Sequence, residues 1–215
     1  MTTIRRDMQV NISDLLKINV LLSDIKNGAK KAIVSTINKT LAGVQTDAVK
    51  ATAAELNLTQ ARIRKDFTVR KATYGFMNGS VRAKGVPVGL MSFSGTKAVK
   101  TGVSVKVKKG GARKILKHAF IGKTRKGVKV EVGPVQMIQN VFWREYSGAR
   151  KPFDPSFPYG RLPKHKRLPV ERLSGPRIED VYGAPEVLSG VMSKAGDRYA
   201  KNLEHEINRI LDAHR

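Results

Sequence analysis

The sequence predicts an α+β protein with N-terminal helices, a central antiparallel sheet that carries a basic hairpin, and a C-terminal amphipathic helix. Three observations lead to this prediction. Apolar residues recur every three or four positions near both ends of the 215-residue chain, as on helices. Between them, apolar residues alternate with polar ones, as in strands. The helical segments do not alternate with the strands, so a doubly wound nucleotide-binding fold is not expected.

Helices are expected in the first third of the chain. The first covers residues 13–24, with Ser13 as its N-cap, and Asn27-Gly28 then breaks the chain. A longer helix follows over residues 29–55, and a short basic one over 61–66. The apolar stripe of the long helix steps by three or four residues through Ile33, Ile37, Leu41, Val44, Ala48 and Ala51.

The period changes to two in the middle of the chain. Val103, Val105 and Val107 alternate with a serine and two lysines, which predicts a half-buried strand with a cationic outer face. Residues 81–93 also alternate, but Gly85 and Pro87 interrupt them, so an edge strand is expected there.

A basic hairpin is expected next. Residues 119–121 and Val128–Val132 read as its two strands, with Lys123–Gly127 as the turn between them. A further strand is predicted over Val141–Tyr146.

Residues 150–169 hold five of the nine prolines, interleaved with basic residues, so we expect an extended arm or loop rather than a regular element. It could wrap a neighbouring subunit, or it could be a disordered loop. Its basic residues are Arg150, Lys151, Arg161, Lys164, Lys166 and Arg167.

The last helix begins at Pro185 and runs to the C-terminus. Its predicted apolar face consists of Leu188, Val191, Met192, Ala195, Tyr199, Leu203, Ile207 and Leu211. Residues 1–215 are interpreted as a single domain that includes the arm.

Charge is the most unusual feature of the composition. The chain has 41 basic and 17 acidic residues, a formal net charge of +24. Residues 57–133 alone hold 19 basic and 2 acidic residues, so most of the excess lies there. Such a surface repels itself and calls for a polyanionic partner, either nucleic acid or acidic protein neighbours. No apolar run is long enough to span a bilayer, and no membrane partner is expected.

Two basic clusters are candidate sites for DNA or for an acidic partner. The first consists of Lys106, Lys108, Lys109, Arg113, Lys114 and Lys117. The second, at the expected hairpin turn, consists of Lys123, Arg125 and Lys126. Phosphate contacts by such residues are independent of base sequence and weaken steeply with salt. Base-specific recognition is not supported, because aromatic residues scarcely interleave with the basic ones. The alternative is an ordinary solvated surface, which the shortage of interspersed acidic residues makes less fitting.

No catalytic, cofactor or metal site is expected, and the protein is interpreted as non-enzymatic. Cysteine is absent, which excludes thiolate chemistry, and the four histidines show no metal-ligand spacing. A metal-dependent nuclease would need Glu131, Glu145 and Asp154 to converge through the fold alone. Ordinary strand and loop carboxylates are the simpler interpretation.

The sequence resembles the minor tail protein Z family of lambda-like long-tailed bacteriophages and prophages. The resembling segments lie in order along most of the chain, whereas residues 142–161 depart from the family's pattern. The resembling segments are Thr36-Ile37-Asn38-Lys39, Ala61-Arg62-Ile63-Arg64, Arg70-Lys71-Ala72-Thr73, His118-Ala119-Phe120-Ile121, the hairpin through Val128, Arg167-Leu168-Pro169-Val170, Leu173-Ser174-Gly175-Pro176 and the closing helix after Pro185.

The resemblance implies a structural tail completion protein, made in the host cytoplasm and placed in the virion at the head-proximal end of the tail. It implies a homo-oligomeric ring, expected to be hexameric, that joins other tail and neck proteins near the head-tail junction. Genomic DNA in the lumen would be met without sequence specificity. A free, sequence-independent nucleic-acid-binding protein is the alternative, and tight, salt-sensitive binding by the isolated protein would favour it.

Overall fold

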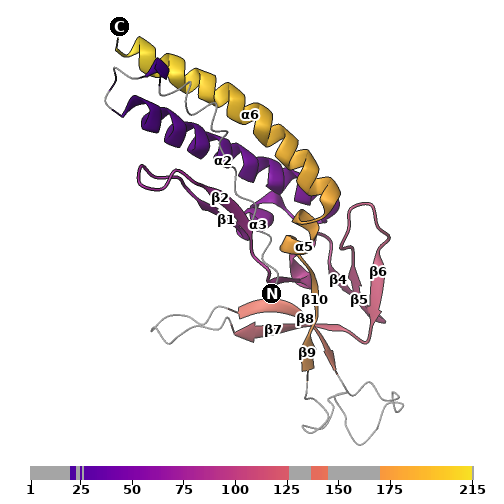
Figure 1. Cartoon of the computed structure of the whole chain (residues 1–215). Helices are drawn as coiled ribbons and strands as arrows, with labels where there is room; N and C mark the ends of the chain where they lie inside the picture. The colour runs from indigo at the N-terminus through magenta and orange to yellow at the C-terminus, as the bar shows by residue number, and fades with distance from the viewer. Residues whose placement is uncertain (1–19, 23–24, 26, 126–136, 145–169, 215) are drawn as a thin grey trace, which may run out of the picture. The chain divides into compact units, whose positions relative to one another are not determined.

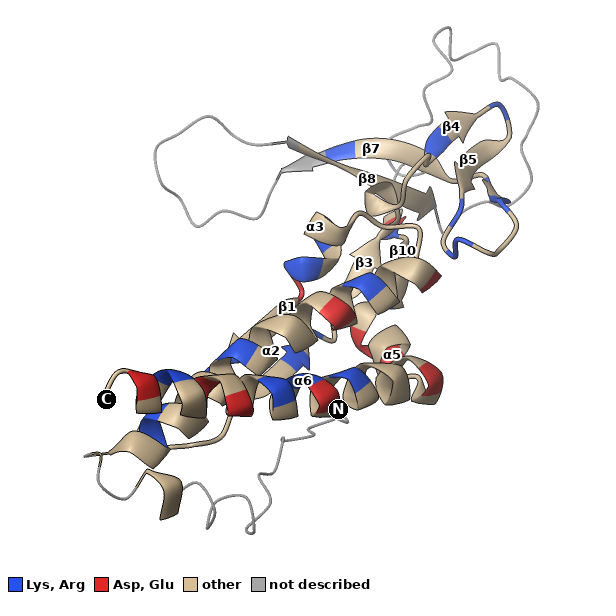
Figure 2. Cartoon of the chain, turned by 90° about the horizontal axis from the view of Figure 1, so that it is seen from above, with Lys and Arg blue, Asp and Glu red and all other residues tan. Residues whose placement is uncertain are grey.

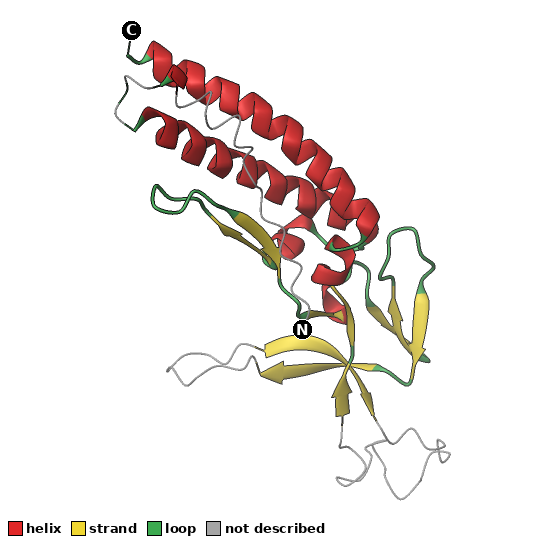
Figure 3. Ribbon diagram, in the orientation of Figure 1, coloured by secondary structure: helices red, strands yellow, loops and turns green. Residues whose placement is uncertain are grey.

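The computed structural model describes residues 20–22, 25, 27–125, 137–144 and 170–214. The chain divides into two compact units. Unit 1 comprises residues 1–54, 60–86 and 177–215, and unit 2 comprises residues 55–59 and 87–176. Helices and small sheets together confirm the predicted α+β class (Figure 3). The interpretation of residues 1–215 as one domain stays a prediction.

Two long helices dominate unit 1. Helix α2 covers Gly28–Glu55 and helix α6 covers Pro185–Asp212, each close to its predicted bounds. They lie side by side and run in opposite directions (Figure 1). The predicted first helix falls largely outside the described residues.

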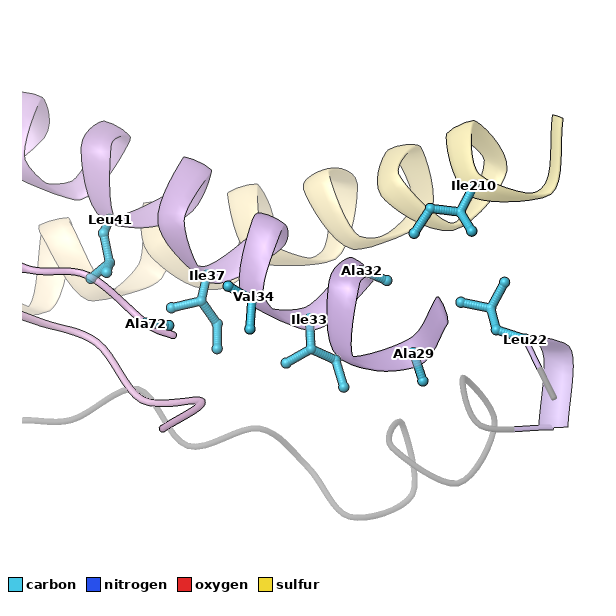
Figure 4. Packing of buried hydrophobic residues seen from close by; sticks show 9 residues of the cluster. All are labelled: Leu22, Ala29, Ala32, Ile33, Val34, Ile37, Leu41, Ala72 and Ile210. Carbon is cyan, nitrogen blue, oxygen red and sulfur yellow. The ribbon is translucent and has the colours of Figure 1, made fainter. Parts of the chain in front are cut away.

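The apolar stripe of α2 forms one side of the core of unit 1. Its predicted members are buried except for Ala51, which is half-buried. On α6, Val191, Ala195 and Ile210 are buried, whereas the predicted Met192 is 37% exposed. Figure 4 shows how α2 and α6 contribute to one apolar cluster, whose buried members are Leu22, Ala29, Ala32, Ile33, Val34, Ile37, Leu41, Ala72 and Ile210.

A two-stranded hairpin packs against α2. Strands β1 (Phe67–Arg70) and β2 (Ser80–Ala83) pair antiparallel, in the register Phe67↔Ala83 to Arg70↔Ser80. The Asn38 amide of α2 donates to the Ala72 carbonyl (3.1 Å) and accepts from the Ala72 amide (2.8 Å). A side chain at Gly79 would collide with Leu41 of α2, so the close approach requires a glycine there. Short helices α3 (Gln60–Arg64) and α5 (Ile178–Tyr182) complete the unit.

Unit 2 consists of short strands. Strands β4, β5 and β6 form one antiparallel sheet, and β7, β8 and β9 form another. Strands β3 and β10 pair with each other, and a 3₁₀ turn follows β3. The bounds are β3 Pro87–Gly89, η1 Leu90–Ser92, β4 Lys97–Val99, β5 Gly102–Val105, β6 Lys114–Lys117, β7 Phe120–Arg125, β8 Met137–Arg144, β9 Val170–Arg172 and β10 Ser174–Arg177.

The predicted strand over Val103–Val107 is shorter than expected. It ends at Val105, and Ser104, placed on the outer face by alternation, is only 3% exposed. The following residues leave the sheet because their backbone bonds elsewhere: the Lys106 carbonyl accepts from the Asn57 side chain (3.0 Å), and Lys108 forms an isolated bridge with Leu56. The predicted edge strand at residues 81–93 is divided into β2 and β3, each paired on one side.

The predicted turn of the basic hairpin is wrong in position. Lys123 and Arg125 lie inside β7, opposite Gln139 and Met137 of β8. The chain therefore turns after Arg125 and returns along β8, which includes most of the strand predicted at Val141–Tyr146. Alternation gives the faces of a strand but not its partner, so the return strand could not be placed from the pattern. Val128–Val132 lie outside the described residues.

Candidate functional site

A cationic surface covers the β4–β5–β6 sheet of unit 2. We call it the basic sheet surface; its members are Lys97, Lys100, Lys106, Lys108, Lys109, Arg113, Lys114 and Lys117. All are exposed except Lys106, which is half-buried. Residues 67–130 contain no aspartate or glutamate, so no carboxylate of this stretch neutralises the cations. Figure 2 shows Lys and Arg without Asp or Glu on β4 and on the connections beside β5, whereas α6 carries both signs.

The segment after β5 is fixed by the residues that follow α2. The Lys109 amide donates to the Glu55 carbonyl (2.9 Å), and the Asn57 amide donates to the Val107 carbonyl (2.8 Å). The Asn57 side chain also donates to the Ser94 carbonyl (2.8 Å). The exposed Lys108 and Lys109 side chains therefore project from a backbone held by several hydrogen bonds rather than from a free loop.

Arg113 is exposed, but hydrogen bonds within unit 2 hold its guanidinium in place. Its Nη1 donates to the Gly95 carbonyl (2.6 Å) and lies 3.4 Å from the Ser104 hydroxyl. Gly95 has φ of 73°, which favours glycine, and its carbonyl is thereby aimed at the guanidinium. Part of the donor capacity of Arg113 is thus used within the fold, and its contribution to an external ligand is smaller than that of the lysines.

The basic side chains do not all share one face. Lys114 lies opposite Val105 and Lys117 lies opposite Gly102. Positions three apart on a strand point to opposite faces, so these two lysines are on different sides of the sheet. Lys97, which pairs with Ser104, lies on the face of Lys117. The sheet consequently presents cations on both of its sides.

An apolar cavity of about 600 Å³ lies on the Lys114 face, within unit 2. Lys108 and Lys114 are the charged residues of its lining. The remaining lining residues are Leu90, Val105, Val107, Gly111, Ala112, Leu116, Leu173, Ser174, Gly175 and Pro176.

The second predicted cluster lies on a different sheet. Lys123 is exposed on β7, and Arg125 ends that strand. Lys126 and the predicted arm residues, Arg150, Lys151, Arg161, Lys164, Lys166 and Arg167, lie outside the described residues. The structure thus brings together the first cluster and places Lys123 apart from it.

No metal-binding group is found in the described part of the chain, where no three His, Asp or Glu side chains gather as ligands. The carboxylates considered for a nuclease, Glu131, Glu145 and Asp154, fall outside that part. None of the helices in the described ranges is long and apolar enough to cross a membrane.

Several charged residues missed by the sequence patterns belong to the framework of unit 1. Glu206 of α6 has no exposed side-chain surface, yet it pairs with Lys39 of α2 and with Arg209. Burial alone would raise the pKa of Glu206, but hydrogen bonds from Lys39, Arg209 and Ser35 outweigh it and lower the pKa to about 2. A carboxylate permanently ionised at neutral pH serves as a fixed link between the two long helices, not as an acid or base.

Comparison with known families decides the class of this protein. The model of the prophage minor tail protein Z family matches residues 17–214, nearly the whole chain. This chain belongs to that family. Minor tail protein Z is a phage tail protein, so the chain is a structural component of the virion tail that contacts other tail proteins. The match covers both units, so the basic sheet surface and the paired helices belong to the minor tail protein Z region. No curated protein and no solved structure matches the chain.

Proposed function

We propose that the protein is a tail completion component that forms a ring at the head-proximal end of the tail, near the head-tail junction. The observation that carries the proposal is the basic sheet surface, where eight cations lie on one small sheet and its connections without acidic residues between them in the sequence. A subunit at a position passed by the genome, or stacked on an acidic ring, needs such a surface. The proposal assigns no chemistry to the protein, because its role is to join surfaces.

The rigid placement of the basic residues supports this role. Lys108 and Lys109 project from a backbone tied to residues 55–57, and Arg113 is fixed to Gly95. A backbone that is already ordered loses less conformational freedom on meeting a partner than a free loop would, which favours assembly. The ring is proposed to be hexameric, and the arm at residues 150–169 is proposed to cross between subunits.

Electron microscopy of lysates from the parent phage with this gene deleted tests the location. We expect separate full heads and tails, or joined particles with defective necks. Normal, infectious particles would overturn the proposal and favour the free nucleic-acid-binding alternative.

A salt titration separates DNA from an acidic protein as the partner of the basic sheet surface. The purified protein is titrated against a short duplex of random sequence, alongside the Lys108→Ser/Lys114→Ser variant. A duplex partner predicts that the slope of log affinity against log salt falls by about 2, roughly 0.9 for each phosphate that is no longer neutralised. The matched control, Lys194→Ser/Lys201→Ser on the exposed side of α6, should leave the slope unchanged. Equal slopes in all three proteins would assign the surface to an acidic protein neighbour.

A further inference from the structure

The loop of the β1–β2 hairpin in unit 1 exposes several large apolar side chains. Tyr74 is 60% exposed, Phe76 49% and Met77 40%. We call these three residues the apolar knuckle. Single exposed apolar residues are common on soluble proteins, but three within four positions form a contiguous patch, and such patches mark interaction sites. Tyr and Phe, together with Met and Arg, are also the residues enriched in protein interfaces.

The apolar knuckle is held in place rather than carried on a loose loop. Thr73 and Phe76 exchange two backbone hydrogen bonds of 2.9 and 3.1 Å, which close a tight turn. At the base of the loop, the paired hydrogen bonds between Asn38 and Ala72 fasten it to α2. The Arg70 guanidinium lies 4.8 Å from the centre of the Phe76 ring and restrains it. A preorganised apolar projection binds with a small entropy cost, so this geometry suits a docking element.

Charge indicates the chemistry of the partner. Arg70 and Lys71 are exposed beside the apolar knuckle, and Asp66, the acidic residue nearest to the hairpin in the sequence, is paired with Arg62 (2.7 Å). A partner that receives these side chains therefore needs an apolar pocket bordered by carboxylates.

The apolar cavity of unit 2, in a second copy of this chain, does not meet that requirement. The apolar cavity of unit 2 could receive apolar side chains, but its charged lining residues are Lys108 and Lys114. Bringing Arg70 and Lys71 to these lysines would place like charges together, which opposes association.

Nucleic acid also fits the knuckle less well than protein. Stacking of unpaired bases needs free ring faces. One face of Phe76 is already occupied by Arg70, and Met77 offers no ring. We infer that the apolar knuckle is the docking element by which this subunit binds a different protein of the particle, one that presents an apolar pocket with an acidic border. The inference rests on the proposed function and names the kind of partner that the assembly requires.

The test complements the gene-deleted phage with the Tyr74→Ser/Phe76→Ser variant expressed from a plasmid. The purified variant should keep the helical circular dichroism and the mass in light scattering of the unaltered protein. Its amount in purified particles, measured by immunoblot, should fall by about 30-fold or more, as expected when an interface hot spot is removed. The matched control is Val86→Ser, which removes an apolar side chain of similar exposure (61%) elsewhere in unit 1 and should be incorporated normally. The conservative variant Tyr74→Phe/Phe76→Leu should restore incorporation.

The outcomes separate this inference from the proposed function. If the deletion itself leaves particles normal, the proposed function fails before the variant is considered. If the deletion blocks assembly but the serine variant is incorporated like the control, the knuckle is not a docking element. A changed mass of the purified variant would assign the knuckle to contacts between copies, and a loss of duplex or single-strand binding with normal incorporation would assign it to nucleic acid. Both results would overturn the inference.

Discussion

The Arg198 guanidinium of α6 passes directly over Gly43 of α2 to reach the Asp47 carboxylate, with 2.7 Å between Nη1 and Oδ2. Both ionic side chains are largely shielded from solvent, so the pair is screened less than a surface salt bridge. Because Gly43 has no side chain, the Arg198 guanidinium can cross α2 at this point. The contact between α2 and α6 therefore depends on a glycine inside a helix, a position that helix propensity alone disfavours.

Gly43→Ala should destabilise unit 1, because the new methyl group would overlap the Arg198 guanidinium and displace it from Asp47. The higher helix propensity of alanine offsets part of this cost by about 1 kcal/mol, so we expect a net loss of about 1 kcal/mol in the free energy of unfolding, measured by urea titration of the helical signal. Gly196→Ala on α6 is the matched control, since its side chain would enter open space. That change should be neutral or stabilising by up to about 1 kcal/mol, and equal losses in both variants would contradict the steric explanation.

Glu206→Gln should destabilise the protein at neutral pH and make little difference in strong acid. The folded-state pKa of about 2 lies below the ordinary value of 4.5, so ionised Glu206 stabilises the fold above pH 4.5. This contribution is lost as the pH falls from 4.5 towards 2. Because Lys39 and Arg209 are about half-exposed and screened by solvent, we expect about 1–2 kcal/mol at pH 7. Urea titrations at several pH values check this, with exposed Glu204→Gln as the control that should show no such trend.

Asn38→Asp should loosen the β1–β2 hairpin from α2. The carboxylate keeps the acceptor for the Ala72 amide but loses the donor to the Ala72 carbonyl, and two oxygens then face each other. Trypsin cleavage after Lys71 should accelerate several-fold under native conditions, as local opening becomes easier. Asn208→Asp on the exposed side of α6 is the control. Unchanged cleavage would mean that packing against α2 is sufficient to hold the hairpin.

Replacing Lys123, Arg125 and Lys126 with serine should leave folding nearly intact, within about 0.5 kcal/mol, as is usual for surface substitutions. We expect a reduced infectious titre in complementation of the deleted phage, because the loss of these cations weakens contact with DNA or with an acidic protein neighbour. Lys123 is exposed on β7. An unaltered titre would mean that these side chains are only solvated.

The helices could be predicted from the sequence because their periodicity is local. The bounds of α2 and α6 follow from the apolar spacing and from Pro185, which opens α6. The family could also be predicted, because the segments that resemble minor tail protein Z follow one another in the family's order along the chain.

The strand partners could not be predicted in the same way. The sequence pattern assigns Lys123 and Arg125 to a turn. Only their register with Gln139 and Met137 of β8 reveals that β7 extends through both residues. Strands β4 and β6 carry no alternation of apolar residues, so Lys97 and Lys114 could not be assigned to one sheet.

Charged contacts between segments far apart in the sequence could not be predicted from the apolar periodicity either. Glu206 interrupts the apolar face of α6, and its pairing with Lys39 depends on the antiparallel arrangement of the helices. The exposed Tyr74 and Phe76 could be noticed as aromatics on either side of Gly75, a turn signal, but their exposure depends on how the hairpin meets α2.

The pairing of α2 with α6 also determines when unit 1 can fold during synthesis. Thr40 accepts a hydrogen bond from Asn202, 162 positions later, so the two halves of this helix pair leave the ribosome far apart in time. At 5–20 residues per second the delay is roughly 10–30 s. During that interval the stripe through Ile33, Ile37 and Leu41 lacks its α6 cover and is open to chaperones. Chains whose translation stops before α6 cannot close unit 1 and leave this stripe uncovered.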